Sequence, residues 1–204
     1  MDLLYQCDIV RERGANPNLN LSTVLRPDSW TKVFQPTVAG MAKTALTVEK
    51  HLYHDMSGFL SMRILAVGDS ITRGSGLPLD QNGYRGFLNT LLTSQIYPVR
   101  WIGRQRGSST SRLWHEGYSG ATVAEIIGRL EPAGSPLDQR PNVVLLMIGT
   151  NNIDRNAAID GSIAQLEELL NLIRNRAGRD TLILISSIIP QGPSKCYLGI
   201  LILG

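Results

Sequence analysis

Short apolar runs alternate with longer amphipathic segments from Met62 onward, and this alternation limits the possible folds more than any other feature of the chain. A short run without polar residues is typical of a strand buried on both faces, and apolar residues three and four positions apart are typical of a helix. Strands and helices in regular alternation form a parallel sheet with helices on both faces. The pattern therefore predicts an α/β fold, a three-layer α/β/α sandwich.

The predicted elements alternate along the chain, beginning and ending with a strand. The expected strands are residues 64–67, 99–102, 143–148 and 181–189. The expected helices lie between Phe87 and Pro98, between Thr122 and Pro132, and between Ser162 and Gly178. Thr122 and Ser162 each stand three residues before Glu or Gln, which is the capping-box pattern of a helix N-terminus, while proline and glycine mark the helix ends.

The pattern of residue types divides the chain into three regions. Residues 1–61 show neither helical nor alternating periodicity, so we expect a poorly ordered leader there. Residues 62–193 contain all the predicted strands and helices and form the expected domain. Residues 194–204 end in an uncharged apolar stretch with no predicted partner element, which makes this tail atypical.

Composition argues against several classes of function. The net charge of +3 is too weak for a surface that binds nucleic acid, and Arg100, Arg104, Arg106 and Arg112 fit a solvated loop. The two cysteines are too few for a disulfide framework or a thiolate metal site. No stretch reaches the roughly 18 apolar residues of a membrane span, and no signal peptide is visible. The compartment and the oligomeric state stay open.

Polar, glycine-bearing segments lie where ligands bind in such folds, near the carboxyl ends of the strands. Residues 68–72 (Gly-Asp-Ser-Ile-Thr) follow the first predicted strand, and residues 149–152 (Gly-Thr-Asn-Asn) follow the third. Residues 115–120 (His-Glu-Gly-Tyr-Ser-Gly) lie in the loop after the second strand. A hydroxyl, a carboxamide and a glycine amide at one edge of the sheet can supply a nucleophile and the donors that stabilise an oxyanion.

These three segments resemble, in order, the first three sequence blocks of the SGNH (GDSL-type) hydrolases, a family with a flavodoxin-like fold. The resemblance covers roughly residues 62–193. Residues 74–86 and His115–Gly117 further resemble the esterases close to the acetylxylan esterases, which remove acetyl groups from a carbohydrate. Members of the family often have Asp where this chain has Asn152.

The resemblance implies a role for each matching residue. Ser70 would be the nucleophile, and the oxyanion would be bound by the backbone N–H groups of Ser70 and Gly120 and by the side-chain amide of Asn151. It implies serine-dependent hydrolysis of a carboxylic ester, with a small-molecule or carbohydrate ester as substrate and deacetylation of a carbohydrate as the specific reaction. It implies no metal and no organic cofactor.

The fourth block of the family, an Asp-x-x-His that supplies the general base, is absent from this sequence. None of the three histidines, His51, His54 and His115, has an aspartate three residues before it. We therefore expect a chain truncated before the fifth strand, with residues 181–189 as an unpaired edge that promotes association between molecules, unless the apolar tail itself pairs as the substitute strand. The alternative function is a catalytically dead remnant, at most a carbohydrate-binding fold; an esterase for long acyl chains has less support.

Ser119, His115 and the pair His51 and His54 are further candidates for chemistry. Ser119 stands in a Gly-Tyr-Ser-Gly-Ala segment close to the G-x-S-x-G nucleophile elbow, but the residues before it do not form a buried strand. His115 could act as a base or have a structural role with its ring bonded to backbone. His51 and His54 have the i, i+3 spacing of a metal pair, yet no third ligand is evident and a solvated segment explains them better.

Overall fold

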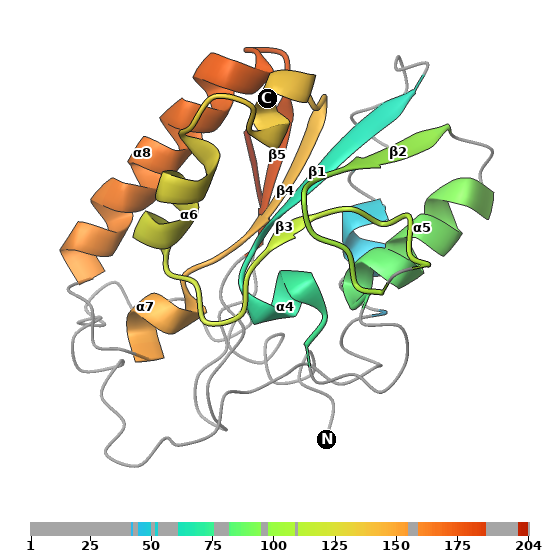
Figure 1. Ribbon diagram of the computed structural model, residues 1–204, viewed down its shortest axis with the longest axis horizontal. Helices are drawn as coiled ribbons and strands as arrows, with labels where there is room; N and C mark the ends of the chain where they lie inside the picture. The colour runs from blue at the N-terminus through green and yellow to red at the C-terminus, as the bar shows by residue number, and fades with distance from the viewer. Residues whose placement is uncertain are drawn as a thin grey trace, which may run out of the picture.

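The computed structural model describes residues 42, 45–49, 52, 61–75, 82–94, 98–108, 110–154, 159–186 and 200–203. Its centre is one sheet with the strand order β2-β1-β4-β5-β6, and β3 pairs with β1 beside this path (Figure 1). The strands are β1 (Met62–Gly68), β2 (Val99–Ile102), β3 (Glu116–Gly117), β4 (Val143–Met147), β5 (Leu182–Ser186) and β6 (Ile200–Leu203). β1, β2, β4 and β5 run parallel, which confirms the predicted α/β class.

Each face of the sheet is covered by its own hydrophobic core. Ile64 and Ala66 of β1 are fully buried on the face covered by α5 (Tyr84–Ser94). Leu65 and Val67 are fully buried on the other face, which is covered by α6 (Val123–Leu130) and α8 (Ile159–Ala177). Figure 1 shows α5 on one side of the sheet and α6 and α8 on the other. The alternation along β1 therefore produces the expected three layers.

The register of β1 brings the polar loop at residues 115–120 to the carboxyl edge of the sheet. β2 pairs with the first half of β1, from Met62 to Leu65. The two residues of β3 then pair with Val67 and Gly68 at its end. On the other side Gly68 lies opposite Met147 of β4. The ends of β1, β3 and β4 therefore lie together.

One of the two predicted capping boxes is present. Thr122 and Glu125 exchange the two hydrogen bonds of the motif at the start of α6. The second prediction is wrong, because α8 begins at Ile159 and Ser162 lies inside the helix. The Ser162 hydroxyl instead accepts a hydrogen bond from the Asn152 side-chain amide, at 3.1 Å. Gly178 ends α8 with a φ of 122°, as expected.

Three short helical segments have too few residues to show a periodicity. They are α4 (Ser70–Arg73), the 3₁₀ helix η1 (Pro136–Gln139) and α7 (Thr150–Asp154). α4 follows β1 and α7 follows β4, so both lie at the carboxyl edge of the sheet (Figure 1). They contain the Ser70 and Asn151 motifs.

The regions on either side of residues 62–193 differ from the expectation where the structure describes them. Residues 45–49 are helical, and Ala45, Val48 and Leu52 are buried in the core beneath α5. The core therefore draws on side chains from before Met62. The tail has a partner, because β6 pairs antiparallel with β5 and covers its backbone edge. The division into three regions otherwise stays a prediction.

Among the helices that the structure describes, none combines the length and the apolar character needed to cross a lipid bilayer.

Candidate active site

Ser70 is the first residue of α4 and lies directly beyond the end of β1. Its side chain is largely buried, with the residue 8% exposed. Asp69 caps the helix, because its Oδ1 accepts the N–H of Ile71 at 2.9 Å. Gly68 packs against the end of β4 so closely that a Cβ there would lie 2.0 Å from the carbonyl oxygen of Met147. The sharp passage from strand to helix therefore requires glycine and a capping aspartate at these positions.

Gly120 occupies the third position of a β-turn from Tyr118 to Ala121. The N–H of Ala121 donates to the carbonyl of Tyr118 at 3.0 Å, and Gly120 has a φ of 77°. Arg140 is the only described residue other than glycine with a positive φ, so φ at Ser119 is negative and the turn is type II, which favours glycine at its third position. The N–H of Tyr118 donates to the carbonyl of Gly68 at 3.0 Å, so the turn is attached to the strand end that precedes Ser70.

Asn151 and Asn152 of α7 attach the other side of the same turn. The Asn151 side-chain amide donates to the carbonyl of Ala121 at 2.9 Å. The Asn152 side-chain oxygen accepts the N–H of Val123 at 3.0 Å, at the start of α6. The amide group of Asn152 also donates to Ser162, which an aspartate at this position could not do when ionised. The sequence-predicted segments around Ser70, Gly120 and Asn151 are thus joined by hydrogen bonds at one edge of the sheet.

Asp69 is a fully buried carboxyl group between α4 and α7. Burial raises its pKa to about 6, against the opposing effect of hydrogen bonds from the Ile71 N–H and the Thr150 hydroxyl. Its Oδ2 has no hydrogen-bond partner among the described residues. The site next to Ser70 therefore contains a carboxyl group that is only partly stabilised in its ionised form.

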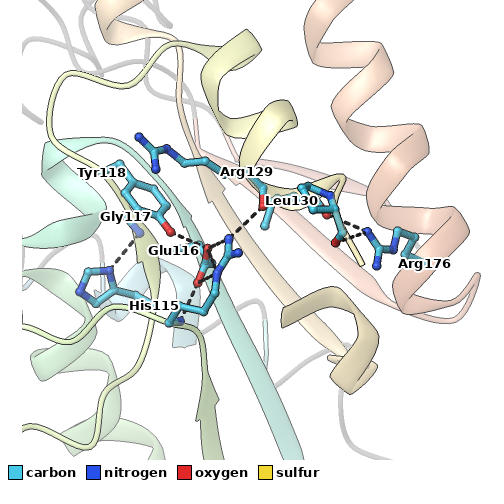
Figure 2. A network of polar contacts seen from close by, with 9 residues as sticks. His115, Glu116, Gly117, Tyr118, Arg129, Leu130 and Arg176 are labelled. Atoms are coloured by element: carbon cyan, nitrogen blue, oxygen red, sulfur yellow. Dashed lines mark hydrogen bonds and ion pairs between the residues drawn. The ribbon is translucent and has the colours of Figure 1, made fainter. Parts of the chain in front are cut away.

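His115 has the structural contact that was one of its two expected roles. Its Nδ1 accepts the N–H of Gly117 at 2.9 Å, as Figure 2 shows, and the residue is 1% exposed. Burial lowers its pKa to about 3, and the positive charges of Arg85 and Arg73 lower it further in the same direction. A neutral imidazole with Nδ1 already occupied is a poor general base near pH 7.

Ser119 does not have the surroundings of a nucleophile elbow. A buried strand does precede it, because β3 ends at Gly117, but no helix follows directly and α6 begins only at Val123. Ser119 is exposed, with its hydroxyl 2.8 Å from that of Ser75. Ser70 instead has the strand before it and the helix after it that the chemistry requires.

Arg85 of α5 is a site residue that periodicity did not predict. It is fully buried and donates to the carbonyl oxygens of Thr72, at 2.8 Å, and Arg73, at 3.1 Å. A third bond goes to the carbonyl of Leu113, ahead of the loop at residues 115–120. Arg85 therefore attaches the helix of Ser70 to that loop. The only signal for it was its place in the segment at residues 74–86 that resembles carbohydrate esterases.

Two arginines expected in a solvated loop make internal contacts. Arg104 forms an ion pair with the buried Glu116, and the Arg106 guanidinium lies 5.3 Å from the centre of the Trp114 ring. Within the described residues, no three His, Cys, Asp or Glu side chains gather closely enough to hold a metal ion. The pair His51 and His54 lies outside the described residues.

An α/β sandwich with these motifs at the carboxyl edge of its sheet defines the class of SGNH hydrolases, enzymes that act on esters. Residues 66–199, more than half of the chain, match the model of the GDSL-like lipase/acylhydrolase family. The chain belongs to this family. A comparison with curated protein sequences finds no significant match.

Solved structures of esterases are similar to this chain. The family 3 carbohydrate esterase of Clostridium thermocellum is 28% identical, with a TM-score of 0.53 over 61% of this chain and 60% of that one. The SGNH-hydrolase family esterase AlinE4 is 26% identical, with a TM-score of 0.46 over 63% and 60% of the two chains. A carbohydrate esterase family 3 protein of Talaromyces cellulolyticus is 24% identical, with a TM-score of 0.48 over 61% and 60%. The chain thus spans about 60% of the length of these structures.

Proposed function

We propose that this chain is an ester hydrolase of the SGNH type in which Ser70 is the nucleophile. The backbone N–H groups of Ser70 and Gly120 and the side-chain amide of Asn151 bind the oxyanion. The observation that supports this proposal is the pair of hydrogen bonds on the Gly120 turn, one from Tyr118 to Gly68 and one from Asn151 to Ala121. Through these bonds all three groups belong to one connected edge of the sheet.

The chemistry divides into an attack and a proton transfer. The Ser70 oxygen attacks the ester carbonyl, and the carbonyl oxygen becomes an oxyanion that accepts hydrogen bonds from the three donors. Removal of one such donor typically costs about 2.7–4 kcal/mol of transition-state stabilisation. The Ser70 proton must pass to a base and from it to the departing alcohol, and water then attacks the acyl-enzyme to release the carboxylic acid and free Ser70.

This sequence contains no motif that matches the family's source of the general base. The family takes it from an Asp-x-x-His, and His115 is neutral, buried and bonded through Nδ1. A serine without a positioned base keeps its proton near neutral pH, so formation of the acyl-enzyme is slow. Serine hydrolases without a triad member retain about 10³–10⁴-fold catalysis over water from the oxyanion donors and substrate binding.

The proposed substrate class is an acetyl ester of a carbohydrate. The similarity to the Clostridium thermocellum family 3 carbohydrate esterase supports this choice, as does the resemblance of residues 74–86 and His115–Gly117 to esterases of that kind. The second candidate function is a fold that binds a carbohydrate ester without turning it over. The missing Asp-x-x-His favours this candidate for the 204-residue chain.

The experiment compares the 204-residue chain with a chimera in which residues after Pro190 are replaced by the corresponding segment of the Clostridium thermocellum esterase. The substrate is the activated ester p-nitrophenyl acetate. We expect the 204-residue chain to hydrolyse it barely above background, with little loss on Ser70→Ala. The chimera should be fast, and Ser70→Ala should abolish its activity, whereas Asn151→Ala should slow it about 10²–10³-fold.

Ser119→Ala is the matched control, because it removes an exposed hydroxyl from the adjacent turn. It should leave the activity of the chimera within about twofold. A folded chimera that is inactive would overturn the hydrolase proposal. Fast hydrolysis by the 204-residue chain, abolished by Ser70→Ala, would show that another group supplies the base, and His115→Gln would then be the next variant to measure.

A further inference from the structure

Glu116 of β3 is a fully buried carboxylate at the centre of a polar network (Figure 2). Four donors meet its two oxygens. The backbone N–H of Arg104 donates at 2.6 Å and the guanidinium of Arg104 donates through Nε and Nη2. The Tyr118 hydroxyl donates at 2.9 Å. The arrangement matches the acceptor capacity of an ionised carboxylate, which has no donor of its own.

This network holds Tyr118, the first residue of the turn that contains Gly120. The Tyr118 ring also lies beneath the Arg129 guanidinium, whose central carbon is 4.1 Å from the ring centre. Tyr118 is therefore fixed by its hydroxyl, by its ring and by its backbone N–H to Gly68. The other end of the turn is fixed by Asn151 through the carbonyl of Ala121.

The network also reaches the helix that follows the turn. Arg104 donates from Nη2 to the carbonyl of Arg129, near the end of α6. α6 begins two residues after the turn, at Val123, and its first N–H groups are held by Thr122 and Asn152. Glu116 thus connects the strand before the turn, the first corner of the turn and the helix after it.

We propose that Glu116 is a positioning residue of the site, which sets the orientation of the turn bearing Gly120 by holding Tyr118 and Arg104. The inference rests on the proposed function for the role of Gly120 as an oxyanion donor. The effect on the turn itself can be measured without any ester. Glutamine at this position would have an N–H₂ group in place of one carboxylate oxygen. Its single side-chain oxygen could not accept the hydrogen bonds of all four donors.

Amide hydrogen exchange of the 204-residue chain tests the proposal, read at Ala121, whose N–H closes the turn. We expect Glu116→Gln and Tyr118→Phe each to accelerate exchange at Ala121 at least tenfold and to shift the amide resonance of Gly120. The amides of β1 and β4 should keep their exchange rates. Tyr118→Phe retains the ring and removes only the hydroxyl, so it tests the proposal even where Glu116→Gln does not fold.

Asp138→Asn is the matched control, because it breaks a second carboxylate–arginine pair near the end of α6. Asp138 forms an ion pair with Arg176, which donates to the carbonyls of Leu130 and Pro132. Figure 2 shows Arg176 apart from Tyr118, on the far side of Leu130. Exchange at Ala121 should change less than twofold in this variant. Unchanged exchange at Ala121 in Tyr118→Phe, or equal acceleration in Asp138→Asn, would overturn the proposal.

The two proposals fail in different ways. Accelerated exchange at Ala121 together with a chimera insensitive to Ser70→Ala would support the positioning role and refute the hydrolase. In an active chimera, Tyr118→Phe should lower kcat about tenfold and leave KM within twofold, since the oxyanion forms only in the transition state. A fall in kcat with unchanged exchange at Ala121 would refute positioning and leave the hydrolase intact.

Discussion

At the scale of single residues, Gly120 combines a backbone requirement with a proposed chemical role. Its φ of 77° lies in the left-handed region that residues with a Cβ adopt at a cost of about 1–2 kcal/mol. The hydrogen bond that closes the turn uses the N–H of Ala121 and not that of Gly120. A side chain at position 120 therefore strains the turn while the contacts at its two corners remain.

The first prediction concerns Gly120→Ala, with Gly128→Ala as its matched control. We expect Gly120→Ala to lower the free energy of unfolding by about 1–2 kcal/mol. Gly128 lies inside α6, and a Cβ there meets no atom within 4 Å. Gly128→Ala should raise the free energy of unfolding by about 0.5–1 kcal/mol, because alanine is the better helix former. Urea denaturation checks both, and equal effects of one sign would contradict the turn assignment.

Two buried titratable residues make the stability depend on pH in opposite directions. The pKa of Asp69 is about 6 in the fold against 3.8 in the unfolded chain. Its contribution to stability is therefore fully present below pH 3.8 and is lost as the pH rises through 6. The pKa of His115 is about 3 against 6.5, so its contribution is complete above 6.5 and is lost as the pH falls toward 3. Between pH 4 and 6 the two effects oppose each other.

The second prediction separates these two effects with Asp69→Asn, a variant that keeps an oxygen to cap α4. Lowering the pH from 7 to 4 should stabilise the unsubstituted chain relative to the variant. The difference between their free energies of unfolding should shift by about 2 kcal/mol in favour of the unsubstituted chain. The sign follows because only the unsubstituted chain gains a proton on folding in this range. Urea denaturation at pH 7, 5.5 and 4 measures the difference, and a constant value would contradict the raised pKa of Asp69.

At the scale of elements, α4 depends on support from outside because four residues cannot form a stable helix alone. The Asp69 side chain accepts the N–H of Ile71 at its start, and Arg85 binds the carbonyls of Thr72 and Arg73 at its end. A single guanidinium fork supplies these bonds and the bond to Leu113. The helix that contains Ser70 is thus held at both ends by side chains.

The third prediction is that Arg85→Lys destabilises the chain although it keeps the charge. One ammonium group cannot reach three carbonyls in the geometry of the fork, and each unsatisfied buried acceptor costs about 1–3 kcal/mol. We expect a loss of about 2–4 kcal/mol in the free energy of unfolding. Arg100→Lys, on the exposed end of β2, should change it by less than about 0.5 kcal/mol. Comparable losses in the two variants would refute this account of Arg85.

The elements that could be predicted from sequence are those with strong local signals. β1, β4 and β5 each contain a continuous apolar run, β2 has one charged residue among its four, and the Thr122 box lies within four residues of chain. The same local pattern at Ser162 failed, because that hydroxyl is engaged by Asn152 of another helix, a contact that no local pattern encodes. β3 and α4 are too short for a period to appear.

The candidate site was partly predictable for a similar reason. Ser70, Gly120 and Asn151 lie in short motifs at strand ends, and the structure brings those segments to one edge of the sheet. Arg85 and Glu116 are charged residues in buried positions, and only their partners identify what they do. The partners of Arg85 are backbone carbonyls, which have no signature in the sequence.

At the scale of the whole molecule, β6 changes the expected behaviour of the sheet edge. The sequence pattern predicts residues 181–189 as an unpaired edge unless the apolar tail pairs with it, and β6 does pair with β5 from Ile183 to Ser186. The N–H and C=O groups on that side of β5 therefore have partners within the chain. Association of molecules through β5 requires the removal of β6 first.

The fourth prediction follows from this pairing. Deletion of residues 196–204 should lower the fraction of monomer, because it exposes the edge of β5. Ile202→Pro keeps the length of the tail but disrupts the ladder opposite Leu184, and it should have the same effect in weaker form. Size-exclusion chromatography with light scattering measures the fraction of monomer. A deletion variant that is more soluble than the full chain would contradict the role of β6.

The bonds around the Gly120 turn also determine when the site forms as the chain folds. Tyr118 bonds to the end of β1, far earlier in the sequence, and Ala121 bonds to Asn151, 30 residues later. Contacts over such separations require large loops to close, which makes them slow and dependent on the native topology. A chain with β4 still undocked therefore lacks the bond from Asn151 to Ala121, and the turn keeps only its bond from Tyr118 to Gly68. Exchange protection at Ala121 should reach its native level only with the docking of β4, so this one amide reports when that docking is complete.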